Sequence, residues 1–271
     1  MIMNRPEISI ITPAYNSEEF IAKTIESVIE QTFSSWEMII VDDGSTDETS
    51  NIVKSFSDSD RRIRYFRLDR NSGRPSVPRN HAIFQSRGDY LAFLDSDDIW
   101  MPEKLGYQLR YMKENDLEFC YGPTLTSGGK HLGSGRLRSR GDLIKHNFIP
   151  CLTVMMRKRE KYLPVFDEEP YLKASEDYFA WLKIYRMTDR VGCYDKCLSR
   201  YRTDRNDNIL REYHRDPHQR MAKEYLFYSK AYLGGALTRR EAVAAYCRIL
   251  FRNLIRNKLK RMLSAFIRPS S

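Results

Sequence analysis

The sequence predicts an α/β fold, with a Rossmann-like, mainly parallel central sheet flanked by helices and a C-terminal helical extension. The first hundred of its 271 residues alternate between short apolar runs and helical stretches, which is the pattern of βαβ units. Three of the first four apolar runs end in polar clusters, as strands do where their loops form a ligand-binding edge. From Gln219 onward the pattern is helical to the end.

The first hundred residues contain four expected strands, each a short apolar run. They lie at residues 8–12, 38–41, 63–66 and 90–94. Apolar residues at helical spacing predict three helices between them, at about residues 17–31, 46–56 and 76–86. Ser17 is the expected N-cap of the first helix, and Thr46 or Asp47 that of the second.

Beyond Pro102 the alternation weakens, and no internal repeat is visible. The expected elements are a helix at 103–114, a strand near Phe119, a strand at 151–156, a helix at 177–187 and an extended segment at 198–202. The stretch 126–141 is polar and rich in Gly and Arg, so we expect it to be a mobile loop.

The composition is that of a globular protein, with 41% hydrophobic and 30% charged residues. No run of about 18 apolar residues is present, so we expect no membrane-spanning helix. The N-terminus lacks the pattern of a signal peptide, which predicts a cytoplasmic protein. The five cysteines are scattered without CxxC spacing, so we interpret them as reduced thiols rather than zinc ligands.

The net charge of +9 is concentrated near the C-terminus. Between Arg239 and Arg268 there are nine Lys and Arg residues against a single acid. In the helix expected there, one face is basic and the opposite face carries Cys247, Leu250, Phe251 and Leu254. Such a helix is expected either to lie on an anionic inner-membrane surface or to pack against the rest of the protein. Nucleic acid is not an expected partner, because no basic stripe is interleaved with base-stacking aromatics.

Three carboxylates, Asp95, Asp97 and Asp98, crowd the end of the fourth expected strand. Repulsion and desolvation make such a cluster costly unless a cation or hydrogen-bond donors compensate it. A hard divalent ion, Mn²⁺ or Mg²⁺, commonly takes one or two carboxylates and completes its shell with water and phosphate oxygens. The cluster therefore predicts a metal-bound diphosphate. The alternative is a group of helix N-cap acids ahead of Trp100.

Two other segments suit the remainder of a nucleotide. Residues 42–45, Asp-Asp-Gly-Ser, follow the second strand, and a carboxylate there suits the N–H of a pyrimidine base or ribose hydroxyls. Residues 71–80 supply a turn, a helix start and the guanidinium of Arg79, which suits base or phosphate oxygens. Each pattern taken alone is common in soluble proteins.

The order of these motifs resembles that of family 2 glycosyltransferases, which have the GT-A fold. The motifs are Ser9 to Asn16, Ile40 to Asp47, Asn71 to Gly73 with Pro78-Arg79-Asn80, Phe93 to Asp98 with the DXD pattern Asp95-Ser96-Asp97, and Ser175-Glu176-Asp177. The resemblance covers about residues 7–205. Through residues 151–155 it is most similar to bacterial enzymes that build teichuronic acid, O-antigen or capsule.

The resemblance implies roles for individual residues. Those implied in nucleotide-sugar binding are Pro13, Tyr15, Asp43, Asn71, Gly73, Arg79, Asp95 and Ser96. Asp97 would hold the metal ion and Asp177 would be the catalytic base, although Asp177 also suits a helix N-cap. Those implied at the acceptor or diphosphate loop are Trp100, Glu176 and Arg202, the last with Tyr201, Asn206 and Asn208. Pro78 stands where the family usually has a small residue, at the start of the segment that carries Arg79.

The expected function is inverting transfer of a sugar from a nucleotide-diphosphate donor, the family's usual UDP-sugar, to a hydroxyl of a lipid-linked acceptor. The catalytic domain would span 1–215, with a nucleotide-binding half at 1–100 and an acceptor-binding half at 101–215, followed by a basic extension at 216–271. The protein would be cytoplasmic or peripheral on the cytoplasmic face of the inner membrane. The alternatives are an inactive nucleotide-sugar-binding protein and a sugar-nucleotidyltransferase, although the glycine-rich phosphate loop of the latter is missing here.

Overall fold

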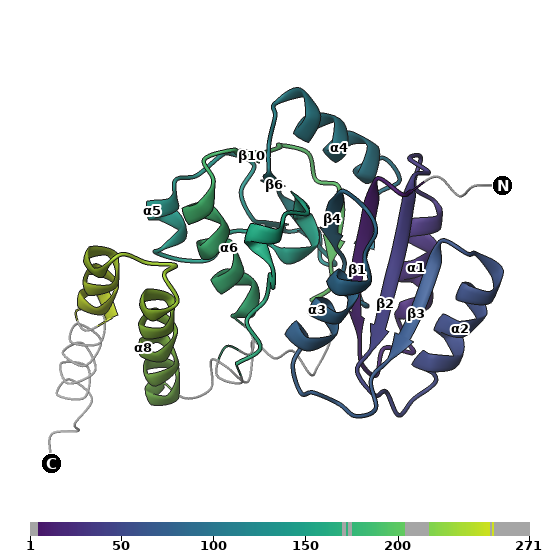
Figure 1. Ribbon diagram of the computed structural model, residues 1–271, viewed down its shortest axis with the longest axis horizontal. Coiled ribbons are helices and arrows are strands. Elements are labelled where there is room, and N and C mark those ends of the chain that lie inside the picture. Colours follow the sequence, from purple (N-terminus) through teal and green to yellow (C-terminus); the bar gives the residue numbers. More distant parts are fainter. Residues whose placement is uncertain (1–4, 170–171, 173–174, 204–216, 250, 252–271) are drawn as a thin grey trace, which may run out of the picture.

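A computed structural model describes residues 5–169, 172, 175–203, 217–249 and 251. Its centre is a seven-stranded sheet covered by helices (Figure 1). The strands, in spatial order, are β10 (Val191–Cys193), β6 (Phe119–Tyr121), β9 (Met155–Arg157), β4 (Tyr90–Phe93), β1 (Ile8–Ala14), β2 (Trp36–Asp42) and β3 (Ile63–Arg67). Neighbours are parallel except at β9, which is antiparallel to both β4 and β6. The expected mainly parallel sheet is therefore confirmed.

Two hydrophobic clusters cover the two faces of this sheet. The helices on one face are α1 (Ile21–Ile29), α2 (Thr49–Ser59) and α4 (Lys104–Glu114), and those on the other are α3 (Ser76–Gln85) and α6 (Glu176–Met187). Within β1, Ile10 packs in the first cluster and Ile11 in the second. Because successive side chains of a strand point to opposite faces and both faces are buried, β1 and β2 consist largely of apolar residues.

Two local expectations are corrected. Ser17 does not cap the first helix: α1 begins at Ile21, and the Ser17 hydroxyl lies 2.7 Å from that of Ser96. The expected strand at 151–156 begins as a 3-10 turn, η1 (Cys151–Thr153), because the amide and the hydroxyl of Thr153 both donate to the carbonyl of Pro150. The strand β9 then follows, and a second 3-10 turn, η2 (Glu160–Tyr162), comes after it.

The stretch expected to be a mobile loop, 126–141, carries regular structure. β7 (Thr124–Thr126) and β8 (His131–Leu132) form a hairpin through Gly129, whose φ of 78° suits glycine. A capping box fixes the short helix α5 (Arg140–Leu143). The hairpin belongs to a second, four-stranded sheet with β5 (Ile99–Trp100) and β11 (Ser199–Tyr201). Since β5 and β11 lie about a hundred residues apart, local sequence patterns do not reveal this sheet.

The C-terminal part forms a helical pair beside the sheet layers (Figure 1). α8 (Pro217–Leu233) lies against α6, and the ring of Tyr178 stacks on that of Phe227 with centroids 4.7 Å apart. A second helix over residues 239–249 buries three side chains, Ala242, Ala245 and Ile249. The beginning of the basic tail therefore packs against the rest of the protein, which was one of the two expected alternatives.

The face that packs is not the apolar face expected from the sequence. Cys247 is exposed, and Phe251 keeps 66% of its surface exposed. Leu250 and Leu254, the other members of that face, lie outside the described residues. Within the part of the chain that is described, no helix is long and apolar enough to span a bilayer.

Lys104 is a fully buried cation at the start of α4. Its ammonium donates to Oε1 of Gln108 at 2.5 Å and lies 4.1 Å from the centroid of the Trp100 ring. Among the described residues it forms no ion pair. Burial lowers the pKa of Lys104 to about 7, so the folded protein does not favour the charged form that predominates in the unfolded chain at neutral pH.

We expect Lys104→Met to be more stable relative to the wild type at pH 6 than at pH 10. Between about pH 7 and 10.5, the unfolded chain binds one more proton at this side chain than the folded protein does. The free energy of unfolding of the wild type therefore rises with pH across that window. The variant lacks the titrating group, so its free energy of unfolding does not rise for this reason. Urea unfolding from pH 6 to 10 measures the difference. Lys54→Met, on the exposed face of α2, is the control and should give a flat profile. A pH-independent difference for Lys104→Met would contradict the expectation.

Candidate active site

The carboxyl ends of the adjacent strands β4, β1 and β2 meet at one edge of the sheet. The loops that follow them are hydrogen-bonded to each other. The amide of Asn16, after β1, donates to the hydroxyl of Ser45, after β2, at 3.0 Å. The hydroxyl contact between Ser17 and Ser96 joins the β1 loop to the β4 loop. The polar clusters expected at the strand ends are therefore brought together.

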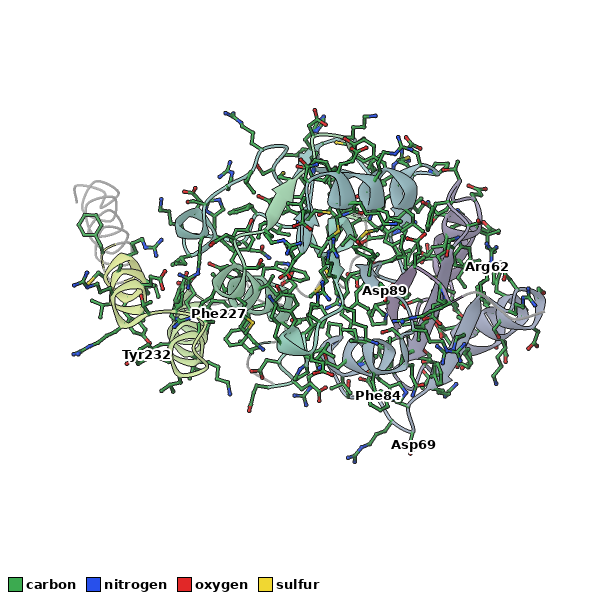
Figure 2. All side chains as sticks on the ribbon, turned by 45° about the horizontal axis from the view of Figure 1, so that its top comes forward. Arg62, Asp69, Phe84, Asp89, Phe227 and Tyr232 are labelled. Carbon is green, nitrogen blue, oxygen red and sulfur yellow. The ribbon has the colours of Figure 1, made fainter. Side chains whose placement is uncertain are left out.

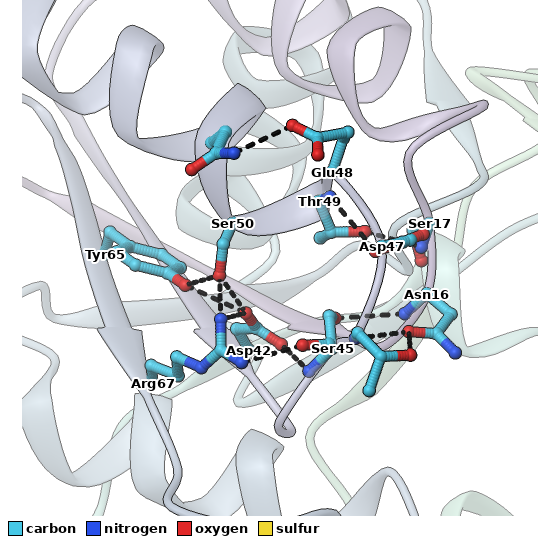
Figure 3. Close-up of polar contacts among 12 residues, drawn as sticks. Asn16, Ser17, Asp42, Ser45, Asp47, Glu48, Thr49, Ser50, Tyr65 and Arg67 are labelled. Atoms are coloured by element: carbon cyan, nitrogen blue, oxygen red, sulfur yellow. Dashed lines mark hydrogen bonds and ion pairs between the residues drawn. The ribbon is translucent and has the colours of Figure 1, made fainter.

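Asp42 anchors the loop after β2 (Figure 3). Its buried carboxylate accepts hydrogen bonds from the amide of Ser45 at 2.7 Å and from the hydroxyls of Ser50 and Tyr65, both at 2.8 Å. Arg67 lies 3.5 Å away and also donates to the carbonyl of Ser45. Burial alone would raise the pKa of Asp42, but these hydrogen bonds outweigh it and lower that pKa. Asp42 is thus fully engaged in shaping the loop.

Asp43 faces the neighbouring loop at residues 71–73. Its two carboxylate oxygens accept from the amide and the hydroxyl of Ser72, at 2.9 and 2.8 Å. Burial raises the pKa of Asp43 despite these bonds. The close approach of the two loops requires glycine at position 44. Gly44 has a φ of 74°, and a Cβ atom there would lie 2.8 Å from the amide nitrogen of Asn71. Asn71 and Gly73 are exposed on the outer side of this contact.

The loop after β4 carries the acidic cluster. Asp95 and Asp97 are partly exposed, whereas Ser96 and Asp98 are buried. Oδ1 of Asp98 accepts the amide of Arg202 at 2.9 Å, and its Oδ2 is buried without a hydrogen bond. Burial, and then the charges of Asp97 and Asp95, raise the pKa of Asp98 well above its usual range. Two carboxylates of the cluster, those of Asp95 and Asp97, are thus partly open to solvent, and that of Asp98 is buried beneath the same loop.

Arg79 links the acidic cluster to α6. One Nη atom lies 2.5 Å from Oδ1 of Asp95, and the other lies 3.4 Å from Oε1 of Glu176. The side chain is 5% exposed and packs over the ring of Phe166. Burial alone would lower the pKa of Arg79, but the charges of Asp95 and Glu176 help to raise it. The guanidinium thus binds two carboxylates of this chain, and its expected contact with a nucleoside stays a prediction.

Asp177 lies in the first turn of α6, beside Glu176. Its Oδ1 accepts the amide of Tyr178 at 2.6 Å, and its Oδ2 accepts the side-chain amide of Asn147 at 3.3 Å. Burial, and next the negative charge of Glu176, raise the pKa of Asp177 to about 7. A carboxyl group with such a pKa can take up a proton at neutral pH, which is what a general base must do.

Arg202 follows β11 and is held against the acidic cluster. Its amide donates to Asp98, its Nε donates to the carbonyl of Asp97 at 3.1 Å, and its guanidinium lies 4.1 Å from the ring centroid of Phe20. Next to it, burial raises the pKa of Tyr201, and the charges of the nearby aspartates add to the effect. A cation is therefore fixed beside the acids, whereas Asn206 and Asn208, expected on the same loop, lie outside the described residues.

The donors available to a divalent ion are carboxylates from the loop after β4. In the part of the chain that the structure describes, no three His, Cys, Asp or Glu side chains gather as ligands, which does not suit a structural zinc ion. The partly exposed carboxylates of Asp97 and Asp95 suit Mn²⁺ or Mg²⁺, which bind one or two protein oxygens and leave other positions to water and phosphate. The unpaired oxygen of Asp98 lies in the same acidic cluster.

The other expected site residues differ in accessibility. Pro13 is buried at the end of β1, and Tyr15 projects with 42% of its surface exposed. Trp100 is 2% exposed, and its indole N–H donates to the carbonyl of Leu152 at 3.0 Å. The ring of Trp100 is thus packed in the interior, and its contact with the acceptor or the diphosphate stays a prediction.

Asn147 is a site residue that the sequence patterns did not indicate. It stands in an irregular segment between α5 and η1, and its contact with Asp177 joins residues 30 positions apart. Its Oδ1 accepts the amide of Ile149 at 3.1 Å, which fixes the orientation of its side-chain amide toward the carboxylate. A lone asparagine in a loop carries no spacing signal, so only the folded chain identifies it.

Solved structures support the fold. The structure of TarS residues 1–349 from S. aureus in complex with UDP-GlcNAc matches with a TM-score of 0.73 and 23% identity over 90% of this chain and 71% of that one. A mannosyltransferase from Pyrobaculum calidifontis, in complex with GDP-Man and Mn²⁺, matches with a TM-score of 0.62 and 15% identity over 96% and 81%. The fold is accordingly GT-A, as expected.

Sequence comparison identifies the family. The putative teichuronic acid biosynthesis glycosyltransferase TuaG of Bacillus subtilis is 36% identical over 208 residues, 74% of this chain and 81% of that protein. The Escherichia coli UDP-Glc:alpha-D-GlcNAc-diphosphoundecaprenol beta-1,3-glucosyltransferase WfgD is 36% identical over 202 residues, 72% and 76% of the two chains. The model of the family "Glycosyl transferase family 2" matches residues 9–168. This chain, with its paired aspartate loops and its Glu-Asp helix start, therefore belongs to glycosyl transferase family 2 and is a glycosyltransferase.

Proposed function

We propose that this glycosyltransferase moves a sugar, with inversion, from a UDP-sugar to a hydroxyl of a lipid-linked acceptor in bacterial surface polysaccharide synthesis. The names of two relatives support the pathway and the acceptor, since one is assigned to teichuronic acid and the other acts on a diphosphoundecaprenol. A solved structure with UDP-GlcNAc supports the donor. The observation that carries the proposal is the carboxyl group of Asp177, whose pKa is raised to about 7 beside the acidic donor loop.

The two halves of the catalytic domain have different roles in this proposal. Residues 1–100 supply the nucleotide-binding half, through Pro13, Tyr15, Asp43 and the loop at 71–73. Residues 101–215 supply the acceptor-binding half. Arg79 is buried between Asp95 and Glu176, so we assign it the task of holding these two halves in register. Residues 216–271 form a basic extension.

The reaction is a single in-line displacement. The acceptor oxygen forms a bond to the anomeric carbon while the bond from that carbon to the diphosphate oxygen breaks, and its electron pair leaves with the nucleotide diphosphate. Asp177 takes the proton of the acceptor hydroxyl. Asn147 orients the base, and Arg202 lies where it can offset the negative charge that develops on the leaving group.

A divalent ion would be held by Asp97, with Asp95 beside it on the ribose. Bound there, the ion supplies positive charge that neutralises the diphosphate as it leaves. The protein's own part is to keep the carboxylates in place. The hydrogen bond that the amide of Arg202 donates to Asp98 ties this loop to the residue that carries the neighbouring cation.

We expect Asp177→Asn to lower kcat by two to four orders of magnitude while leaving UDP affinity within about threefold, because Asn cannot accept the proton. Wild-type kcat should rise with pH through about 7, since only the ionised carboxylate is a base, and this limb should vanish in the variant. Release of UDP from candidate donors, measured between pH 5 and 9, gives kcat and its dependence on pH.

Asp189→Asn, an exposed acid after the same helix, is the matched control and should behave as wild type. The raised pKa of Asp177 costs stability above pH 4, so Asp177→Asn should melt no lower than the wild type at pH 8. Near-normal transfer by Asp177→Asn contradicts the assignment of the base. If neither protein turns over any donor, the alternative of an inactive nucleotide-sugar-binding protein is favoured.

We expect Asp97→Ala to abolish the gain in UDP affinity that Mn²⁺ gives the wild type, because the ion loses its protein ligand. Calorimetry with UDP, in 2 mM MnCl₂ and in EDTA, measures that gain, which should be at least tenfold for the wild type. Asp58→Ala, an exposed acid on α2, should retain it. An unchanged manganese effect in Asp97→Ala would show that another residue binds the ion.

We also propose that the basic tail docks on the anionic surface of the inner membrane. The helix at 239–249 packs through Ala242, Ala245 and Ile249, which leaves Cys247 and Phe251 exposed on another face. Cations precede and follow these apolar side chains in the sequence. An apolar strip bordered by Lys and Arg suits the interface of an anionic bilayer, where a lipid-linked acceptor lies. The protein would then act at the cytoplasmic face.

We expect the full chain to float with vesicles that contain 30% phosphatidylglycerol, and a chain that ends at Phe251 to remain in the load fraction. That end point keeps the packed side chains of the helix while removing residues 252–271 and their positive charge. Neutral phosphatidylcholine vesicles are the lipid control. Flotation of neither chain removes membrane docking through the tail, and equal flotation of both shows that residues 252–271 have no part in it.

A further inference from the structure

A hollow of about 740 Å³ lies at the amino ends of the strands, on the edge of the sheet opposite the candidate active site. We call it the back pocket. Five arginines line it: Arg5, Arg61, Arg62, Arg64 and Arg87. β2 begins there with Trp36 and ends at Asp42, so about 20 Å of strand separate the two sites. Figure 2 shows Arg62 far from Tyr232 of α8, toward the other end of the molecule.

The back pocket has more positive charge than its acids neutralise. Three arginines are ion-paired: Arg5 with Asp89 at 2.8 Å, Arg62 with Asp60 at 2.6 Å, and Arg64 with Glu37 at 2.9 Å. Arg61 and Arg87 are exposed, and their guanidinium groups make no hydrogen bond or ion pair with the described residues. Five guanidinium groups against three carboxylates leave a net charge of +2 around one hollow.

The two unpaired guanidinium groups come from different sides of the pocket. Arg61 precedes β3 and Arg87 precedes β4, and in the sheet these strands have β1 and β2 between them. Three strand spacings put their starting points about 14 Å apart. A ligand with several linked oxyanion groups can meet both side chains at once. A single small anion would require both side chains to fold inward over the middle strands.

Trp36 lies at the base of the arginine side chains, at the start of β2. It is 2% exposed, lines the back pocket, and its indole N–H is buried without a hydrogen-bond partner. The guanidinium of Arg62 lies 3.9 Å from the centroid of its ring. Among the described residues, no exposed large hydrophobic side chain lines this pocket, which makes it unlike a surface that inserts into a membrane.

We propose that the back pocket is a second binding site, specific for a soluble anion with several linked phosphate groups. Arg61 and Arg87 bind its ends, because guanidinium groups match phosphate oxygens in charge and in bidentate geometry. The paired arginines and the side chain of Trp36 complete the lining. The site is separate from the donor site and does not rest on the identity of the donor.

The test is calorimetry of the full chain with sodium tripolyphosphate, in EDTA and low salt so that no metal links the probe to the acidic loop. We expect one saturable site in the wild type, at least tenfold tighter for tripolyphosphate than for inorganic phosphate. Arg61→Ala combined with Arg87→Ala should weaken it at least tenfold. Arg110→Ala combined with Arg186→Ala, which removes two exposed arginines elsewhere, should change it less than twofold.

Other outcomes overturn the proposal. Equal losses in both double variants would mean attraction to net charge alone. A loss in Arg202→Ala, with binding kept in Arg61→Ala/Arg87→Ala, would place the probe in the donor site. If anionic vesicles in a sedimentation assay bind the chain through Arg61 and Arg87 while tripolyphosphate does not, the surface recognises lipid. Thermal melts of every variant exclude misfolding, and Arg61→Gln with Arg87→Gln repeats the test with bulkier neutral side chains.

Discussion

The buried guanidinium of Arg79 is the contact on which the candidate active site depends. It joins Asp95, at the end of β4, to Glu176, at the start of α6, from a position that is 5% exposed. Removing one member of such a group leaves the others charged and desolvated, which costs about 3–5 kcal/mol. The strand that carries the acidic loop and the helix that carries Asp177 are therefore held together by compensated charge as well as by apolar packing.

The ion pair with Arg79 also gives the adjacent carboxylates of Glu176 and Asp177 different environments. Glu176 is ion-paired with Arg79, so its charge is compensated where it is buried. Asp177 accepts hydrogen bonds from the amide of Tyr178 and, at 3.3 Å, from Asn147, but burial and the charge of Glu176 outweigh them and raise its pKa to about 7. Neighbouring acids with different environments can thus serve structure and proton transfer within one helical turn.

The sheet also separates two electrostatic environments. Its carboxyl edge gathers aspartates from the loops after β2 and β4, which suits a cation with a diphosphate. Its amino edge gathers five arginines around the back pocket. The net charge of +9 of the whole chain does not predict the local charge at either edge of the sheet. The local charge depends on which strand ends lie side by side. Parallel strands produce this separation, since all of them carry their N-terminal flanking residues to one edge and their C-terminal loops to the other.

The sequence by itself determined the elements whose signal is local. The apolar runs of β1 to β4, the amphipathic helices between them and the polar clusters after them predicted the mainly parallel sheet and the edge that holds the site. Only the tertiary structure decided that Arg79 binds Glu176, 97 residues away, that the ring of Trp100 is buried, and that Asn147 meets Asp177. These contacts join segments distant in the chain, and a side chain's partner there depends on burial and geometry, which no periodic pattern encodes.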